Sequence, residues 1–288
     1  IPEGLPIFAT IALATGLQEM ARRDALVNRL SSVETLGSTT VICTDKTGTL
    51  TENRLAVAEF AVAGEGGSPQ PQRYLAAGFP ATQANPARSV GDAPEGVRSR
   101  VELIRRLGAL CTNVEAGSEV GDPLEVALVR DAGESGVDLA ALREESPEVQ
   151  EIAFDSALME MATIHRDGGE YFAAVKGAPE RVLEQSSRSA FGRWKALADE
   201  MSNDGLRVLA VARRSLQTKN DHQLEPHEVY ADLELAGLVG LRDPARPEIA
   251  QVIEQCRQAG IRVVMVTGDN ARTARAIGED VGIVGGGD

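Results

Sequence analysis

A short apolar run that ends in an acid is the feature that most constrains this chain. Residues 39–44 are β-branched and apolar, which predicts a short buried parallel strand, and Asp45 follows at its carboxyl end. Open α/β sheets bind ligands at that edge. Between Lys46 and Thr51 the chain supplies an ammonium group, a glycine turn at Gly48, hydroxyls and backbone N–H groups that can surround a phosphate. A carboxylate repels a phosphate, so the arrangement requires cations and favours an acid that is itself the nucleophile.

A second stretch repeats this pattern near the other end of the chain. Residues 261–266 are apolar and are followed by Thr267, Gly268, Asp269 and Asn270, then by a helix whose N-terminus faces the same edge. Two strand ends of this kind, far apart in sequence, must meet at one site. The simplest solution is a Rossmann-like parallel sheet interrupted by an insert from roughly 57 to 236, itself an antiparallel sheet flanked by helices.

Hydrophobic periodicity and turn residues give the elements of the insert. The stretch 61–100 is rich in Gly, Pro, Gln and Ala, and we expect an irregular connection there with one short strand. The remaining pattern predicts helices at 98–111, 123–131 and 190–203, and strands at 152–154, 159–165, 171–175, 206–212 and 235–241.

Glu125 has a local explanation. Asp122 is a good N-cap, Pro123 suits the first helical position, and Glu125 stands where a capping-box glutamate does. A side chain that caps its own helix needs no further role. A part in ligand binding therefore has to be argued from more than local sequence.

Composition limits the partners. Lys and Arg number 29 against 43 Asp and Glu, a formal net charge of −14, which disfavours nucleic acid. The three cysteines lack C-x-x-C spacing, so neither a disulfide framework nor a zinc site is indicated. The aromatic content of 3% implies cores built mainly from Leu, Val, Ile and Ala.

The first seventeen residues, 1–17, are mostly apolar, but they are too short for a confident membrane span. Pro2 and Pro6 bracket Glu3 and break a helix there, leaving free carbonyls beside a carboxylate. Such a broken helix lines a cation site in a membrane. The alternative is a polar turn before a buried soluble helix. Both ends of the chain look cut from something longer.

Six motifs in a fixed order give the chain a family resemblance. Together they resemble the P-type ATPases, and the first resembles the fourth transmembrane helix of the P2-type calcium pumps. The motifs are P-E-G-L-P (2–6), D-K-T-G-T-L-T (45–51), G-D-P-L-E-V-A-L (121–128), K-G-A-P-E (176–180), G-L-R-V-L-A (205–210) and T-G-D-N (267–270).

The resemblance implies an α/β protein: a haloacid-dehalogenase-like Rossmann phosphorylation domain split by an α+β nucleotide-binding domain with an antiparallel sheet. The implied parts are the end of a transmembrane helix and stalk (1–27), the first part of the phosphorylation domain (28–56), the nucleotide-binding domain (57–236) and an incomplete second part of the phosphorylation domain (237–288). It also implies a multi-pass pump in the cell membrane, with this portion mainly cytoplasmic and the lipid bilayer as a partner.

The resemblance assigns roles to residues as well. Asp45 would attack the γ-phosphate of ATP, with Mg²⁺ held by Asp45 and the Thr47 carbonyl and with Glu3 as a ligand of the transported cation. The implied catalytic residues are Asp45, Lys46, Thr47, Thr267, Gly268 and Asp269. The implied nucleotide-site and hinge residues are Glu125, Phe154, Lys176, Gly177, Arg207, Asp243, Arg246 and Asn270.

One segment departs from the family pattern. After Phe154-Asp155-Ser156 the family usually has basic residues, whereas this chain has Ala157, Leu158, Met159 and Glu160. We therefore expect weaker ATP affinity than the family pattern would give. The family's downstream lysine and magnesium-binding acids would follow residue 288, so the chain by itself should bind ATP and turn it over slowly or not at all.

Three readings of the whole chain follow. The favoured one is the catalytic portion of an ATP-driven cation pump, with Ca²⁺ favoured over other ions. Apart from the helix that contains Glu3, the helices that would coordinate the ion are not in the sequence. One alternative is a soluble dehalogenase-type phosphatase with a cap domain. The other is a nucleotide-binding module whose Asp45 is never phosphorylated.

Overall fold

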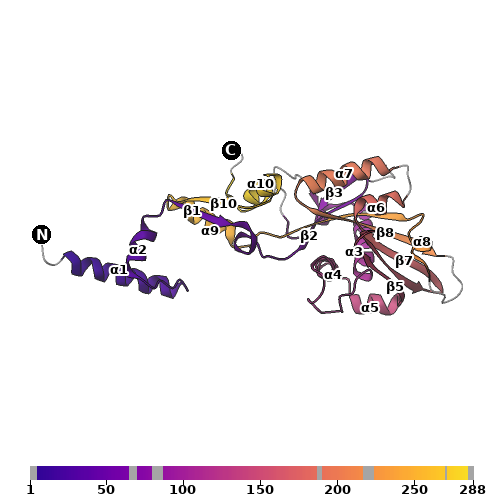
Figure 1. Ribbon diagram of the computed structural model, residues 1–288, viewed down its shortest axis with the longest axis horizontal. Coiled ribbons are helices and arrows are strands. Elements are labelled where there is room, and N and C mark those ends of the chain that lie inside the picture. Colours follow the sequence, from indigo (N-terminus) through magenta and orange to yellow (C-terminus); the bar gives the residue numbers. More distant parts are fainter. Residues whose placement is uncertain are drawn as a thin grey trace.

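The computed structural model describes residues 5–64, 70–79, 87–186, 190–216, 224–269 and 271–284. The molecule is elongated, with three parts arranged along its length (Figure 1). The helices α1 (Leu5–Arg22) and α2 (Leu30–Gly37) lie at one end. A small sheet with two helices follows, and a large sheet with its own helices forms the other end.

The small sheet brings together the two strand ends that the sequence predicts to meet. β1 (Val41–Asp45) and β10 (Arg262–Val266) pair in parallel, with Asp45 opposite Val266. The helices α9 (Ile249–Gln258) and α10 (Ala271–Asp280) flank β10 along the chain. The predicted parallel pairing is therefore confirmed, because two strands from opposite ends of the sequence present their carboxyl ends at one edge.

The large sheet has eight strands in the order β4-β3-β2-β9-β8-β7-β6-β5. All neighbours are antiparallel except β3 and β4. This confirms the mixed α/β class with an antiparallel sheet between the two parallel strands. The strands are β2 (Ala56–Ala63), β3 (Pro71–Leu75), β4 (Arg88–Ser89), β5 (Glu148–Asp155), β6 (Glu160–Asp167), β7 (Glu170–Gly177), β8 (Arg207–Leu216) and β9 (Glu234–Arg242).

Helices cover both faces of the large sheet, and each face has its own core. On one face, α3, α4 and α5 pack over a core that includes Phe60, Ile104 and Met161. On the other, α6 and α7 pack over a core that includes Trp194 and Met201. The helices are α3 (Glu95–Leu110), α4 (Pro123–Glu134), α5 (Leu139–Glu145), α6 (Pro179–Glu184), α7 (Phe191–Asn203) and the short α8 (Pro226–Val229).

The stretch 61–100 is less irregular than its composition suggests. β2 runs to Ala63, β3 and β4 follow, and α3 begins at Glu95. The expectation of an irregular connection with one short strand is wrong here. β2 is an inner strand with helices over both faces of its sheet, so its residues are buried on both sides and show no alternation of apolar and polar residues. Residues 236 and 237, where the domain boundary is expected, lie within β9, which pairs with β2 as far as Arg242.

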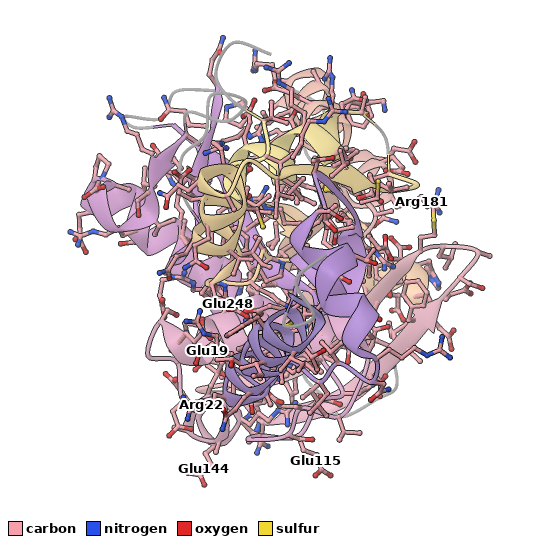
Figure 2. The ribbon with its side chains drawn as sticks, turned by 90° about the vertical axis from the view of Figure 1, so that its left-hand side faces the viewer. Glu19, Arg22, Glu115, Glu144, Arg181 and Glu248 are labelled. Carbon is pink, nitrogen blue, oxygen red and sulfur yellow. The ribbon has the colours of Figure 1, made fainter. Side chains whose placement is uncertain are left out.

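Charged side chains cover the outside of the molecule. Figure 2 labels Glu19 and Arg22 on α1, and Glu115 and Glu144 at the rim of the large part, all of them exposed. No helix among the residues that the structure describes has the length and apolar character needed to cross a membrane.

His165 is a buried polar residue to which the sequence assigned no role. It lies on β6, is fully buried, and stacks on Phe172 with the ring centroids 5.4 Å apart. Its Nδ1 is 3.0 Å from the Ser146 carbonyl and its Nε2 is 2.8 Å from the Thr163 hydroxyl. Burial is the main cause that lowers the pKa of His165 below its ordinary value. Burial therefore favours the neutral form of this imidazole in the folded protein.

The pH dependence of stability tests this placement. Because the unfolded chain binds a proton more readily than the folded one, the free energy of unfolding should fall as pH drops below 6.5. The slope from this one group reaches at most about 1.4 kcal/mol per pH unit. Urea unfolding between about pH 7.5 and about pH 5.5 should show a steeper loss for wild type than for His165→Gln. The exposed-site control His227→Gln should follow wild type, and parallel curves for wild type and His165→Gln would contradict the assignment.

Candidate functional site

The loop that follows β1 presents Asp45 to solvent. The Lys46 backbone N–H donates to Asp45 Oδ1 at 2.7 Å, which fixes one carboxylate oxygen at the start of the turn. Gly48 has a φ of 74°, a left-handed conformation that a side chain would strain. The Gly48 N–H and the Lys46 carbonyl both contact the Thr51 hydroxyl. The turn is thus held closed from inside while the carboxylate of Asp45 stays exposed.

A salt bridge joins this loop to the end of β10. Lys46 Nζ lies 2.7 Å from Asp269 Oδ2, and the Lys46 side chain is only 12% exposed. The Asp269 backbone N–H donates to the Thr267 hydroxyl at 3.1 Å. Asp45, Lys46, Thr267, Gly268 and Asp269 therefore gather at one edge of the small sheet, as their motifs led us to expect. The lysine is paired with an acid here, so its charge is partly offset.

Asp243 and Arg246 hold the chain where it leaves and re-enters the small sheet. The Thr51 hydroxyl donates to Asp243 Oδ2 at 2.6 Å, and the Arg54 backbone N–H donates to the other carboxylate oxygen at 3.2 Å. Arg246 donates to the Gly48 carbonyl at 3.0 Å. Both side chains thus brace the loop behind Asp45.

A separate cavity of about 530 Å³ opens in the large part of the molecule. Apolar side chains form much of its wall, including Leu124, Phe154, Met159 and Met161. Phe154 is 61% exposed, so its ring face is free to receive a ligand. The polar residues of the wall are Asn113, Asp122, Glu125, Lys176 and Arg207, with Gly121, Gly177, Ala178, Val208 and Leu209 completing it. The five residues that the family motifs assign to the nucleotide-binding domain therefore line one cavity.

A buried ion pair forms part of the cavity wall. Lys176 Nζ lies 2.7 Å from Glu125 Oε1, and the two side chains are 9% and 11% exposed. The ammonium group also donates to the Cys111 carbonyl. Glu125 Oε2 accepts from the Thr112 hydroxyl at 3.1 Å and from the Asn113 N–H at 3.0 Å. Among the described residues, the hydrogen-bond partners of the Glu125 carboxylate all lie on other segments.

The capping-box interpretation of Glu125 is wrong for this reason. Asp122 does cap the helix, because its carboxylate accepts from the Leu124 N–H at 2.8 Å, and Pro123 occupies the first turn as predicted. Glu125 instead turns across the cavity to Lys176. The Glu125 carboxylate is attracted more strongly by the buried ammonium group of Lys176 than by the solvated N–H groups at the start of its own helix, α4.

The Lys176-Gly177 corner has a packing reason as well as a place in the cavity. A Cβ atom on Gly177 would lie 2.7 Å from the Met159 carbonyl and 2.9 Å from Glu160 Cβ. A glycine is therefore needed at position 177 so that the start of β6 can pack against the end of β7, whether or not a ligand also comes close to this backbone. Glu160 itself is buried; burial raises its pKa, and Gln185 Nε2 donates to both of its carboxylate oxygens.

Three residues around the buried ion pair, of which Asn113 alone lines the cavity, were missed from the sequence. Cys111, Thr112 and Asn113 contact the ion pair, yet none belongs to a motif recognised above. Burial raises the pKa of the Cys111 thiol, and Cys111 contacts the ion pair through its backbone carbonyl. The apolar end of the preceding helix was the only pattern that the sequence showed in that region, and it indicates a helix rather than a binding site. Glu3 and Asn270, both named from the sequence, lie outside the described residues.

Within the described part of the chain, no cluster of three or more His, Cys, Asp or Glu side chains could hold a metal ion. A Mg²⁺ ion that takes one or two protein ligands and completes its shell with phosphate oxygens needs no such cluster. The exposed Asp45 carboxylate and the carbonyl of the exposed Thr47, two residues later, are hard oxygen donors of the kind that such an ion would take.

Comparison with known proteins agrees with this arrangement. The family model of the P-type ATPase cytoplasmic domain N matches residues 105–248. The chain therefore belongs to the P-type ATPase family. That match covers all the residues that line the cavity and excludes the loop that carries Asp45.

Curated relatives match over the whole chain. The cation-transporting ATPase pma1 of Synechocystis is 34% identical, with all of this chain and 33% of the relative covered. A calcium-transporting ATPase of Listeria monocytogenes is 35% identical over 99% of this chain and 32% of its own length. The probable cation-transporting ATPase F of Mycobacterium tuberculosis is 38% identical over 99% of this chain and 32% of its own length. The chain thus spans about a third of each relative.

Removing the lysine from the buried pair should be costly. In Lys176→Met the Glu125 carboxylate stays buried without its cation, and we expect a loss of about 3–5 kcal/mol in the free energy of unfolding. The double variant with Glu125→Gln should recover a large part, because the stranded charge is gone. Urea unfolding followed by circular dichroism measures both.

An exposed ion pair provides the matched control. Lys195 lies 3.5 Å from Asp199 on α7 with both side chains in solvent, so Lys195→Met should cost less than about 1 kcal/mol. Equal losses for Lys176→Met and Lys195→Met would show that burial of the Glu125–Lys176 pair does not govern its energetics.

Proposed function

We propose that this chain is the ATP-binding and phosphorylated portion of a membrane-bound, ATP-driven cation pump. The observation that carries the proposal is the convergence of Asp45 and its loop with the Thr267-Gly268-Asp269 turn at one sheet edge. The cavity with its exposed aromatic ring and polar wall lies in a different part of the molecule. One part is suited to hold a nucleotide, and the other to accept its phosphate.

The charges in the cavity indicate which end of a nucleotide it receives. Glu125 and Lys176 neutralise each other, so the inner wall favours an uncharged ring over a phosphate group. Phe154 offers a face for stacking. Arg207 is exposed at the start of β8 and supplies a cation to the phosphates at the cavity mouth. The base would therefore enter first, with the phosphates directed outward.

Asp45 then acts as the nucleophile. A carboxylate oxygen of Asp45 attacks the γ-phosphorus in line, the bond from that phosphorus to the bridging oxygen breaks, and ADP leaves with the electron pair. The product is an acyl phosphate on Asp45. Thr267 and Gly268 are placed to hold the transferred group through a hydroxyl and an N–H, and Lys46 with Asp269 orders the loop. Mg²⁺, held by Asp45 and the Thr47 carbonyl, would supply charge neutralisation.

Delivery of ATP requires the two parts to approach each other. The connections run through Leu55 beside β2 and through Asp243 after β9, where the hydrogen bonds described above tie the strands together. These short connections suit a hinge between a nucleotide-binding domain and a phosphorylation domain. In the pump the acyl phosphate would drive alternating exposure of the cation site, to which Glu3 would belong.

Calcium is the cation that we favour. The Listeria relative is named as a calcium-transporting ATPase, and so are relatives from Bacillus subtilis and yeast at 34% identity. The other relatives described above are named only for cation transport. The P-E-G-L-P motif around Glu3, which resembles that of the calcium pumps, also favours calcium.

Acid-quench labelling tests the reaction. Intact protein in membranes, incubated with γ-labelled ATP and Mg²⁺ with and without Ca²⁺, should acquire hydroxylamine-sensitive label on Asp45 that depends on Ca²⁺. Asp45→Asn should abolish the label because an amide oxygen is a poor nucleophile. The exposed control Asp167→Asn should leave it intact.

The outcomes separate the three readings of the chain. Label that depends on another cation keeps the mechanism and replaces the ion. ATP binding without label under any cation favours the non-catalytic module. Hydrolysis of small phosphate esters through Asp45 favours the soluble phosphatase.

The departure from the family pattern near Phe154 gives a second test. Met159 lines the cavity and is 40% exposed, so a lysine there would carry its charge in solvent near the phosphates. Met159→Lys should raise ATP affinity by about three- to tenfold at low salt, and high salt should reduce the gain. Isothermal titration calorimetry measures both. Val149→Lys adds the same charge at an exposed position of β5 outside the cavity, and an equal gain there would mean that net charge alone is responsible.

A further inference from the structure

We propose that Thr112 is a positioning residue of the nucleotide cavity, acting on the ligand through Glu125 and Lys176. The inference rests on the proposed function, because it assigns a role within the same cavity. Its basis is a short segment, Cys111 to Val114, that crosses behind the ion pair and contacts both of its members. No motif in the sequence assigns a role to this segment.

The hydrogen bonds of the ion pair show what the segment does. An ammonium group has three donors, and Lys176 directs two of them to Glu125 and to the Cys111 carbonyl. A carboxylate offers about four acceptor positions, and Glu125 uses three of them for Lys176, Thr112 and the Asn113 N–H. About one donor and one acceptor therefore remain for a ligand, and the segment fixes where they point.

Thr112 is the side chain in this arrangement that cannot touch the ligand itself. It is 1% exposed and is not among the residues that line the cavity. Its hydroxyl oxygen accepts from the Val114 N–H at 3.0 Å, which leaves the hydroxyl proton free to be donated to Glu125. Any effect of Thr112 on binding must therefore pass through its neighbours.

The segment is held rigidly from its far side. Arg143 on α5 donates to the Thr112 carbonyl and to the Val114 carbonyl, each at 3.0 Å. The backbone is thus fixed at two points beside the hydroxyl. A rigid donor orients a carboxylate better than a mobile one, because little entropy is lost when the ligand binds.

Loss of this hydroxyl should weaken binding without removing any group that contacts the ligand. In Thr112→Val the Glu125 carboxylate loses one donor and gains freedom to rotate, and Lys176 turns with it. Hydrogen bonds to charged groups are among the stronger ones, so we expect ATP to bind about tenfold more weakly. Thr112→Ser keeps the hydroxyl and should bind within about twofold of wild type.

The test is a double-variant cycle on the intact protein, with ATP as the probe in isothermal titration calorimetry. Thr112→Val is measured alone and in a Glu125→Gln background, and circular dichroism shows that each variant is folded. If Thr112 acts through the carboxylate, the tenfold effect should shrink to less than about twofold in that background. If Thr112→Val does not fold, Thr112→Ala takes its place, because the smaller side chain avoids an apolar group against the Val114 N–H.

Two results would overturn the positioning role while leaving the proposed function in place. One is wild-type affinity in Thr112→Val, and the other is an undiminished effect of Thr112→Val in the Glu125→Gln background. Failure of wild type to bind ATP is a separate result, which would overturn the proposed function and this inference with it.

Discussion

The parallel pairing of β1 with β10 is the constraint on which the rest of the structure depends. It requires the chain to leave the small sheet after Asp45 and to return before Arg262. The intervening chain can do so only if its own ends lie together. β2 and β9, which begin and end the large sheet along the chain, are neighbours, with Ala56 opposite Arg242. The bridge between Thr51 and Ala245 continues that pairing toward the loop behind Asp45. The large part is thus a closed unit with adjacent ends.

The sequence was sufficient for the elements that have an uninterrupted apolar run or a clear helical period. The strands at β1 and β10 are short, apolar and followed by polar turns, and the helices α3, α4 and α7 have clear periodicity, so their existence could be predicted. The expectation that residues 39–44 form a buried strand is wrong, because β1 lies in a sheet of only two strands and its apolar side chains Val41 and Ile42 are exposed. β2 could not be predicted, because a strand buried on both faces lacks alternation and its alanines fit several structures.

The same distinction applies to the site. Asp45 and Lys176 could be named because their motifs are long and ordered, and Phe154 because of its counterpart in the family. The structure brings Lys176 and Phe154 to one cavity. Thr112 could not be found, because its role depends on a contact between α4, β7 and the segment after α3. Glu125 shows the converse. Its local sequence predicts a helix cap, and a lysine 51 positions away overrides it. Long-range electrostatics decides in a buried site what local sequence decides at a surface.

The contact between α10 and the large part bears on whether a hinge can move. Arg242 lies 2.8 Å from Asp280, and both side chains are largely buried. Burial is the main cause that raises the pKa of Asp280, although Arg242 opposes it. One carboxylate oxygen of Asp280 is buried without a hydrogen-bond partner among the described residues. A pair held in this way gains little over two solvated charges, because desolvation offsets most of the attraction.

Close packing between α10 and the turn before β8, in contrast to the Arg242–Asp280 pair, holds the two parts in one relative position. A Cβ atom on Gly205 would lie 1.9 Å from the Thr273 hydroxyl, so α10 sits directly against the turn before β8. Arg207, two residues later, lines the cavity and is exposed. Movement of α10 would therefore be felt where the phosphates of a bound nucleotide would lie. In the proposed hinge, the glycine contact would define one orientation of the two parts, and the ion pair would add little resistance to their separation.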